Sequence, residues 1–243
     1  MAQNIYDDPA FFAAYAGLPR SVVGLDGAAE WPMLRSLLPD LVGRRMVDLG
    51  CGFGWYCRWA AEAGAASVLG IDLSTNMLER ARGTTDDERI TYEQQDLDAL
   101  DLPAATFDVA FSSLTLHYLV HLDAVLTAVH RALVPGGAFV CSVEHPIFTA
   151  PTSPAFASAA DGHPIWPLDA YSLEGPRTTD WLAPGVVKHH RTIGTYVSLL
   201  VAAGYTIASL IEWSPSDEQL VDHPEWTVER DRPPFLLLAA RRH

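Results

Sequence analysis

The chain has 243 residues, 49% of them hydrophobic and 19% charged, which is an ordinary composition for a globular protein with one large domain. Its 16 basic and 30 acidic residues give a formal charge of −14. Because nucleic acids bind basic surfaces, this balance argues against DNA, tRNA or rRNA as a substrate and favours a small molecule, while a protein acceptor stays open. We expect a single domain over residues 1–243.

The sequence also bears on compartment and membrane contact. Apolar stretches fall short of the roughly 18–20 residues that cross a bilayer, and the first residues lack the basic and apolar parts of a secretion signal. The three cysteines, Cys51, Cys57 and Cys141, form no CxxC pair and no even disulfide set. We therefore expect a cytoplasmic protein without a membrane partner, and the choice between a monomer and a homodimer stays open.

Residues 1–42 are predicted to form an N-terminal helical cap, with helices near 8–16 and 26–38. Strands and helices then alternate, which predicts a parallel, doubly wound α/β sheet with ligands at the carboxyl ends of its strands. The expected strands begin at residue 45 and continue at 67–71, 89–93, 107–111, 138–143, 205–213 and 234–240. The expected helices lie at 55–63, 74–82, 122–133 and 192–203.

Residues 145–190 interrupt this alternation. The stretch is rich in proline and aromatic residues, too long for a plain connection and too aromatic to be disordered. We interpret it as a lid inserted after the fifth strand, over the site.

The most informative motif is the run Val-Asp-Leu-Gly-Cys-Gly-Phe-Gly. Its glycines, Gly50, Gly52 and Gly54, follow a predicted strand and open a helix, so the backbone can turn through positive φ and approach a ligand closely. The next strand ends in Asp72, whose carboxylate can accept hydrogen bonds from both hydroxyls of a ribose. Trp55 stands where a dinucleotide fingerprint needs its third glycine. The motif therefore predicts a nucleoside site and disfavours an NAD-dependent oxidoreductase.

This motif resembles motif I of the class I S-adenosylmethionine-dependent methyltransferases, in particular their small-molecule, methyltransferase-11-like members. The resemblance extends over residues 44–144, where the strand at 107–111 resembles motif IV and Gln95-Asp96-Leu97 resembles the segment that contacts adenine. It implies a Rossmann-like, seven-stranded sheet of order 3-2-1-4-5-7-6, with strand 7 antiparallel, N-terminal helices and a lid after strand 5. It also implies S-adenosylmethionine as cofactor and in-line methyl transfer to a small-molecule acceptor, with residues 145–190 selecting that acceptor.

The resemblance assigns most of the cofactor site. The glycine loop should lie along the amino-acid half of the cofactor, Asp72 should bind the ribose, and Asp96 should bind the adenine amino group. Arg20 is expected to pair with the cofactor's carboxylate. Cys51, inside the glycine loop, is a nucleophile, a cofactor contact or a small buried filler between two glycines. The full set expected to bind the cofactor is Tyr15, Arg20, Asp48, Gly50, Cys51, Gly52, Asp72, Leu73, Met77, Asp96, Leu97, Ser112 and His117.

Catalytic candidates follow the fourth and fifth strands. His117 is a general base, a group packed over the methionine end of the cofactor, or a structural histidine in a turn. Glu144 or His145 could orient or deprotonate the acceptor, or be turn residues before a proline. Acceptor contacts are expected from His145, Trp166, His189 and His190, with a solvated loop as the alternative for the two adjacent histidines.

No metal is expected at the site. His117 and His121 are four residues apart, but no carboxylate or thiolate stands at ligand spacing near them. A sulfonium donor is already activated, so methyl transfer needs neither metal nor covalent intermediate. For the same reason no catalytic residue is obligatory, and a non-catalytic module that binds S-adenosylmethionine or S-adenosylhomocysteine stays as the alternative function.

Overall fold

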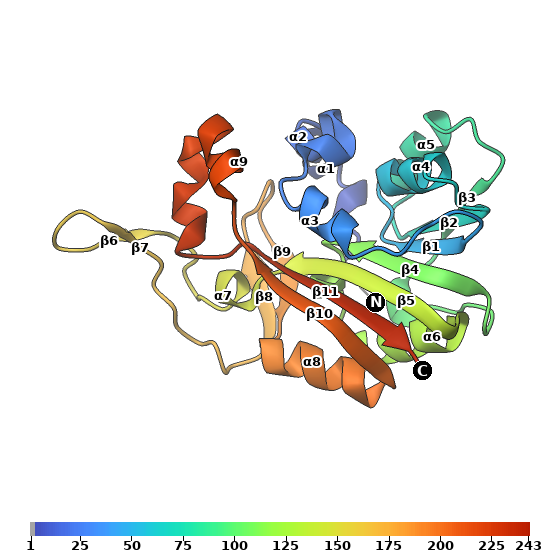
Figure 1. Cartoon of the computed structure of the whole chain (residues 1–243). Helices are drawn as coiled ribbons and strands as arrows, with labels where there is room; N and C mark the ends of the chain where they lie inside the picture. The colour runs from blue at the N-terminus through green and yellow to red at the C-terminus, as the bar shows by residue number, and fades with distance from the viewer. Residues whose placement is uncertain (1–2) are drawn as a thin grey trace.

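Seven strands form one mixed sheet in the computed structural model, which describes residues 3–243 (Figure 1). The strand order is β10-β11-β5-β4-β1-β2-β3, and neighbours run parallel except β11, which is antiparallel to both β5 and β10. Counted along the chain, this is the expected order 3-2-1-4-5-7-6 with strand 7 antiparallel, so the fold prediction is confirmed. The strands are β1 (Arg45–Leu49), β2 (Ser67–Asp72), β3 (Ile90–Gln94), β4 (Phe107–Ser113), β5 (Leu133–Glu144), β10 (Tyr205–Trp213) and β11 (Phe235–Arg242).

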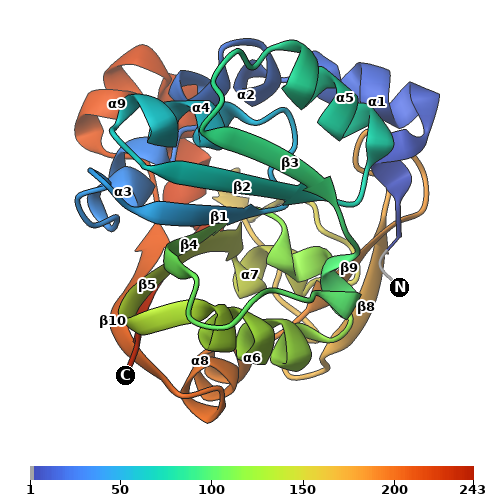
Figure 2. The ribbon, with the colours of Figure 1, turned by 90° about the vertical axis from the view of Figure 1, so that its right-hand side faces the viewer.

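Helices cover both faces of this sheet (Figures 1 and 2). One face carries α3 (Trp31–Ser36), α4 (Trp55–Glu62) and α5 (Thr75–Gly83), and the other carries α6 (Leu122–Ala132) and α8 (Ile193–Ala202). The shorter elements are η1 (Ile5–Asp7), α1 (Pro9–Ala16), α2 (Pro19–Val22), η2 (Gly24–Gly27), η3 (Leu97–Ala99), η4 (Leu116–Tyr118), α9 (Asp217–Asp222) and η5 (Pro224–Arg230). Among residues 3–243, no helix is both long and apolar enough to span a bilayer.

Two apolar cores result from the alternation of side chains along the strands. In β1, Met46 packs with the helices of one face, while Val47 and Leu49 pack with those of the other. Each of these side chains has essentially no exposed surface. The sheet is therefore buried on both faces, and a site can open only where its strands end.

The interruption at residues 145–190 contains two small hairpins and one short helix. α7 (Pro146–Thr149) follows β5 directly, and β6 (Ala157–Ser158) pairs with β7 (Pro164–Ile165) in a hairpin that projects from the body of the molecule (Figure 1). β8 (Gly175–Thr179) pairs with β9 (Val186–His190), and β9 packs against η4 and α7. The second hairpin is thus brought back to the ends of β4 and β5.

Two predicted elements differ from the structure. The helix expected at 26–38 is split into η2 and the shorter α3, because Pro32 fits only the first turn of a helix and Gly27 packs directly on the backbone of Pro19. The fifth strand begins at Leu133 rather than at residue 138. Gly136 adopts a φ of 78° within it, which lets the chain pass from α6 into β5 without a separate loop.

Candidate active site

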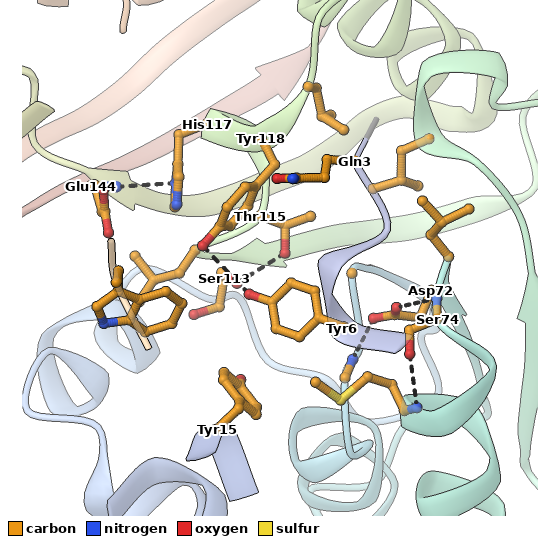
Figure 3. A pocket seen from close by; sticks show the side chains of 18 of the residues that line it. Gln3, Tyr6, Tyr15, Asp72, Ser74, Ser113, Thr115, His117, Tyr118 and Glu144 are labelled. Carbon is orange, nitrogen blue, oxygen red and sulfur yellow. Dashed lines mark hydrogen bonds between the residues drawn. The ribbon is translucent and has the colours of Figure 1, made fainter. Parts of the chain in front are cut away.

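A cavity of about 530 Å³ lies at the carboxyl ends of the parallel strands (Figure 3). Its walls come from the tips of β1 to β5, from the N-terminal segment, from the β8–β9 hairpin and from the chain that leads into β11. The position is the one expected for ligand binding in a doubly wound sheet.

The glycine turn forms one wall of the cavity. Gly50, Gly52 and Gly54 have φ values of 79°, 51° and 72°, a region that favours glycine. A Cβ atom on Gly50 would lie 2.2 Å from Oγ1 of Thr115, whereas one on Gly52 would meet open space. The turn therefore packs tightly against the chain after β4 on one side and presents bare backbone on the other.

Asp72, the last residue of β2, is tied to this turn through backbone hydrogen bonds. Its Oδ2 accepts from the N–H of Gly52 and its Oδ1 accepts from the N–H of Ser74, each at 2.9 Å. Burial raises the pKa of this carboxyl group, and the backbone donors oppose that rise. Each oxygen keeps a lone pair for a further donor, so the carboxylate is oriented and still able to accept hydrogen bonds.

Apolar side chains line most of the cavity beside Asp72. Leu73, Met77 and Leu97 line it, and the last two are almost completely buried. Asp96, at the turn after β3, also lines this end, and its Oδ1 accepts from the N–H of Asp98 at 3.0 Å. Apolar side chains with one carboxylate at the edge match the needs of a planar base with an exocyclic amine.

Several polar and charged side chains lie beyond the glycine turn, where β4 and β5 end. His117 is buried, and its Nδ1 accepts from the backbone N–H of Glu144 at 3.3 Å (Figure 3). Burial, together with the charges of Lys188 and Arg191, lowers the pKa of His117 to about 4, although Glu144 opposes the shift. The imidazole is therefore neutral at pH 7, and with Nδ1 accepting, its proton resides on Nε2.

Glu144 forms a buried ion pair with a residue of the lid. Nζ of Lys188, on β9, donates to Oε1 of Glu144 at 2.5 Å, and the two side chains are 4% and 15% exposed. The same ammonium lies 4.9 Å from the centroid of the Trp181 ring, which lines the cavity. The second oxygen, Oε2, is buried without a hydrogen-bond partner among the described residues.

Aromatic side chains close the cavity from the N-terminal side. The hydroxyl groups of Tyr6 and Tyr118 lie 3.5 Å apart, and the ring of Tyr6 packs edge-on against that of Tyr15 at 5.2 Å (Figure 3). Burial raises the pKa of all three phenols, so they stay protonated at neutral pH. Arg20 also lines the cavity, with Nη2 bound to both oxygens of the buried Glu30 at 3.1 and 3.0 Å.

Comparison with known proteins identifies this architecture. The chain is 57% identical to an S-adenosylmethionine-dependent methyltransferase from Mesorhizobium loti, whose crystal structure superimposes with a TM-score of 0.88 over 90% of this chain and 100% of the other. The model of the methyltransferase domain family matches residues 47–141. The chain belongs to the S-adenosylmethionine-dependent methyltransferases.

Two further relatives set the limits of this likeness. An uncharacterized protein of Haemophilus influenzae is 32% identical over 98% of this chain and 97% of its own length. The 27-O-demethylrifamycin SV methyltransferase of Amycolatopsis mediterranei is 34% identical over 43% of this chain, which spans only 40% of that relative. The likeness to this methyltransferase with a named substrate thus covers less than half of either chain.

The residues of the cavity fit the methyltransferase cofactor, S-adenosylmethionine. Gly52 presents backbone to open space, and Asp72 is held by two backbone donors with lone pairs to spare. Asp96 lies beside the apolar pocket of Leu73 and Met77. These residues would hold the adenosine, and Nε and Nη1 of Arg20, which do not bind Glu30, would be available to the amino-acid end.

Three residues expected to bind the cofactor of this methyltransferase lie behind the cavity wall. Asp48 is buried, accepts a hydrogen bond from the thiol of Cys57 at 3.4 Å, and has its pKa raised to about 7 by burial. Cys51 is buried against the neighbouring strand, close to Gly70, as the filler interpretation describes. The hydroxyl of Ser112 donates to the carbonyl of Leu49 at 2.8 Å. None of the three lines the cavity.

The predicted acceptor contacts also lie outside the cavity lining. His145 caps α7 through Nδ1, and its Nε2 lies 2.9 Å from Oε1 of Glu212. His190 bridges Thr149 and the carbonyl of Tyr171, while His189 is half-buried on β9. Trp166 donates from Nε1 to the carbonyl of Ile147 at 2.9 Å. These residues were chosen because they follow β5 or belong to the lid, but their side chains do not line the cavity.

Other cavity residues were missed by the sequence analysis. Trp181 and Phe148 come from the lid, while Glu229 and Arg232 come from the acidic segment before β11, which carried no expected element. The sequence offered only weak signals for them. Trp181 and Phe148 are aromatic residues of the lid, and Arg232 is a charged residue directly before Pro233-Pro234. Among residues 3–243, no group of three or more His, Cys, Asp or Glu side chains is arranged to hold a metal ion.

Proposed function

We propose that this methyltransferase transfers the methyl group of S-adenosylmethionine to a small-molecule acceptor by in-line displacement. The observation that carries the proposal is the shape of the cavity, which continues from the nucleoside end at Asp72 and Asp96 to Glu144 and Trp181 within about 530 Å³. This volume is in the range of small-molecule sites. The formal charge of −14 supports the same conclusion, because it disfavours nucleic acid as the acceptor.

In this proposal residues 1–42 form a cap and residues 145–190 a lid, and together they exclude water. The amide of Gln3 donates to the carbonyl of Gly185 at 3.0 Å and its oxygen accepts from the N–H of Val187 at 2.9 Å. These bonds tie the N-terminal segment to the β8–β9 hairpin over the cavity. The three cysteines are buried free thiols, which supports a cytoplasmic location.

Glu144 is the group we propose for removing a proton from the acceptor. The bound cofactor supplies an activated methyl group, so the protein must position the acceptor and, where it carries a proton, accept that proton. Nδ1 of His117 already accepts a hydrogen bond, and His145 is bonded at both nitrogens. Oε2 of Glu144 is the candidate atom without a partner among the described residues.

The test is turnover with a panel of phenols, carboxylic acids and amines, measured as release of S-adenosylhomocysteine. Transfer from a chiral-methyl donor should proceed with inversion at the methyl carbon, and retention would contradict in-line displacement. Glu144→Gln should reduce kcat about 100-fold or more with an acceptor that must lose a proton, while cofactor affinity is kept. Glu212→Gln, which changes an exposed carboxylate outside the cavity, is the matched control. Cofactor binding without turnover of any acceptor would favour the non-catalytic alternative.

A further inference from the structure

Arg232 lines the end of the cavity that lies farthest along the sheet from the nucleoside end. Asp72 and Asp96 mark the tips of β2 and β3, at one side of the sheet. Arg232 precedes β11, whose first residue, Phe235, pairs with Glu144 at the end of β5. The strands β1 and β4 therefore separate Arg232 from the adenosine end, and the arginine lies on the acceptor side.

Aromatic rings from the lid surround this guanidinium. Its central carbon lies 4.4 Å from the ring centroid of Phe148, 4.5 Å from that of Trp166 and 5.0 Å from that of Phe156. Trp166 is held in place by its hydrogen bond to the carbonyl of Ile147. Rings that pack against a guanidinium leave its planar edge, which carries the N–H groups, as the direction for a ligand.

The hydrogen bonds of this cation are incomplete. Arg232 is 8% exposed, and Nη2 is bound to Glu229, but Nε is buried without a partner among residues 3–243. Arg232 is therefore ion-paired, as Arg20 is with Glu30 and Lys188 with Glu144, and it differs from those two cations in its buried Nε, which has no acceptor among the described residues. A buried, charged donor without an acceptor is costly, and such a group on a cavity wall is typical of a binding site.

We propose that Arg232 binds a carboxylate of the acceptor, which deepens the proposed function and rests on it. A carboxylate fits the planar edge of a guanidinium and supplies the missing acceptor for Nε. Glu229 and Glu144 also face this cavity, so a singly charged anion is favoured over a doubly charged phosphate, which both carboxylates would repel. Arg232, positioned by the lid rings, thus selects acceptors by charge.

The probes are benzoate, phenylacetate, 3-phenylpropionate and hexanoate, each titrated against its neutral amide into the full chain saturated with S-adenosylhomocysteine. At least one carboxylate should bind about tenfold or more tightly than its amide. Arg232→Met should abolish that preference, while Glu229→Gln should strengthen carboxylate binding severalfold by removing a neighbouring negative charge. A purely structural role for the pair would weaken binding in both variants.

Arg35→Met is the matched control, because Arg35 also packs on an indole ring, that of Trp59, but lies outside the cavity. It should keep the preference for the carboxylate. The proposal is overturned if no carboxylate binds better than its amide, or if phenyl phosphate binds better than every carboxylate. It is also overturned if Arg232→Met weakens S-adenosylhomocysteine binding, because the arginine then serves the cofactor. Failure of the unmodified protein to bind S-adenosylhomocysteine would instead contradict the proposed function.

Discussion

The two ends of the cavity are built in different ways. The cofactor end is organised by the backbone of a short stretch of sequence, in which the N–H groups of Gly52 and Ser74 orient the Asp72 carboxylate. The acceptor end consists of side chains from distant segments, such as the Glu144–Lys188 pair and Arg232 against the lid rings. The cofactor end therefore depends on local backbone conformation, whereas the acceptor end depends on contacts between side chains that are far apart in the sequence.

The largest effect on stability is expected at the acceptor end, from Lys188→Met. This change leaves the carboxylate of Glu144 buried without its partner, and breaking a buried pair on one side costs about 3–5 kcal/mol of unfolding free energy. Urea denaturation measures the loss. The double variant Glu144→Gln/Lys188→Met should regain much of it, because no unpaired charge then stays buried.

The exposed pair Arg131–Asp101 supplies the control. Its side chains are 55% and 93% exposed, so Arg131→Met should cost less than about 1 kcal/mol. An unfolding free energy for Lys188→Met within that same range would contradict the buried-pair account.

At the cofactor end, the comparison is between Gly50→Ala and Gly43→Ala. Both glycines have positive φ, which costs an alanine about 1–2 kcal/mol. The Cβ atom at Gly50 would also collide with Thr115, whereas that at Gly43 meets nothing within 4 Å. We expect a loss of roughly 3 kcal/mol or more for Gly50→Ala, together with loss of cofactor binding, and only the backbone cost for Gly43→Ala. Equal losses of unfolding free energy in the two variants would show that the close contact between Gly50 and Thr115 does not affect stability.

His117 gives a pH-dependent difference between folded and unfolded chains. Its pKa is lowered from 6.5 to about 4 in the folded protein, so the unfolded chain binds the extra proton first as the pH falls. The neutral imidazole makes its full contribution to the unfolding free energy above about pH 6.5. This contribution, at most about 3 kcal/mol, is lost as the pH falls from about 6.5 to about 4. As the pH is lowered through this window, the unfolding free energy of His117→Gln should decrease less steeply than that of the unmodified protein. Parallel curves would contradict a buried, neutral His117.

Short-range spacing predicted the doubly wound sheet and the residues grouped at the cofactor end, whereas the strand order was implied by the resemblance to class I methyltransferases. Gly50, Gly52 and Asp72 stand at positions that a strand–turn–helix–strand unit brings together by its own geometry. Asp96 follows from the same rule at the next strand. These residues all lie around the cavity.

The acceptor end could not be predicted in this way. Lys188 reaches Glu144 across 44 residues, and Arg232 meets Phe148 across a longer separation, through a hairpin and a loop whose packing no periodicity encodes. His145 and His190, chosen for their position after a strand or in the lid, are instead engaged in capping and bridging bonds. Which polar side chains of an insertion face the cavity depends on how the insertion folds, and that fold depends on long-range contacts.

The affinity for S-adenosylhomocysteine of two variants, Asp72→Asn and Arg232→Met, tests most directly the division of the cavity into a cofactor end and an acceptor end. Asp72→Asn should weaken binding in a calorimetric titration by about 1–3 kcal/mol, the scale of a hydrogen bond to a charged group, whereas Arg232→Met should leave it unchanged. Unchanged affinity in Asp72→Asn, or a comparable loss in Arg232→Met, would contradict that division.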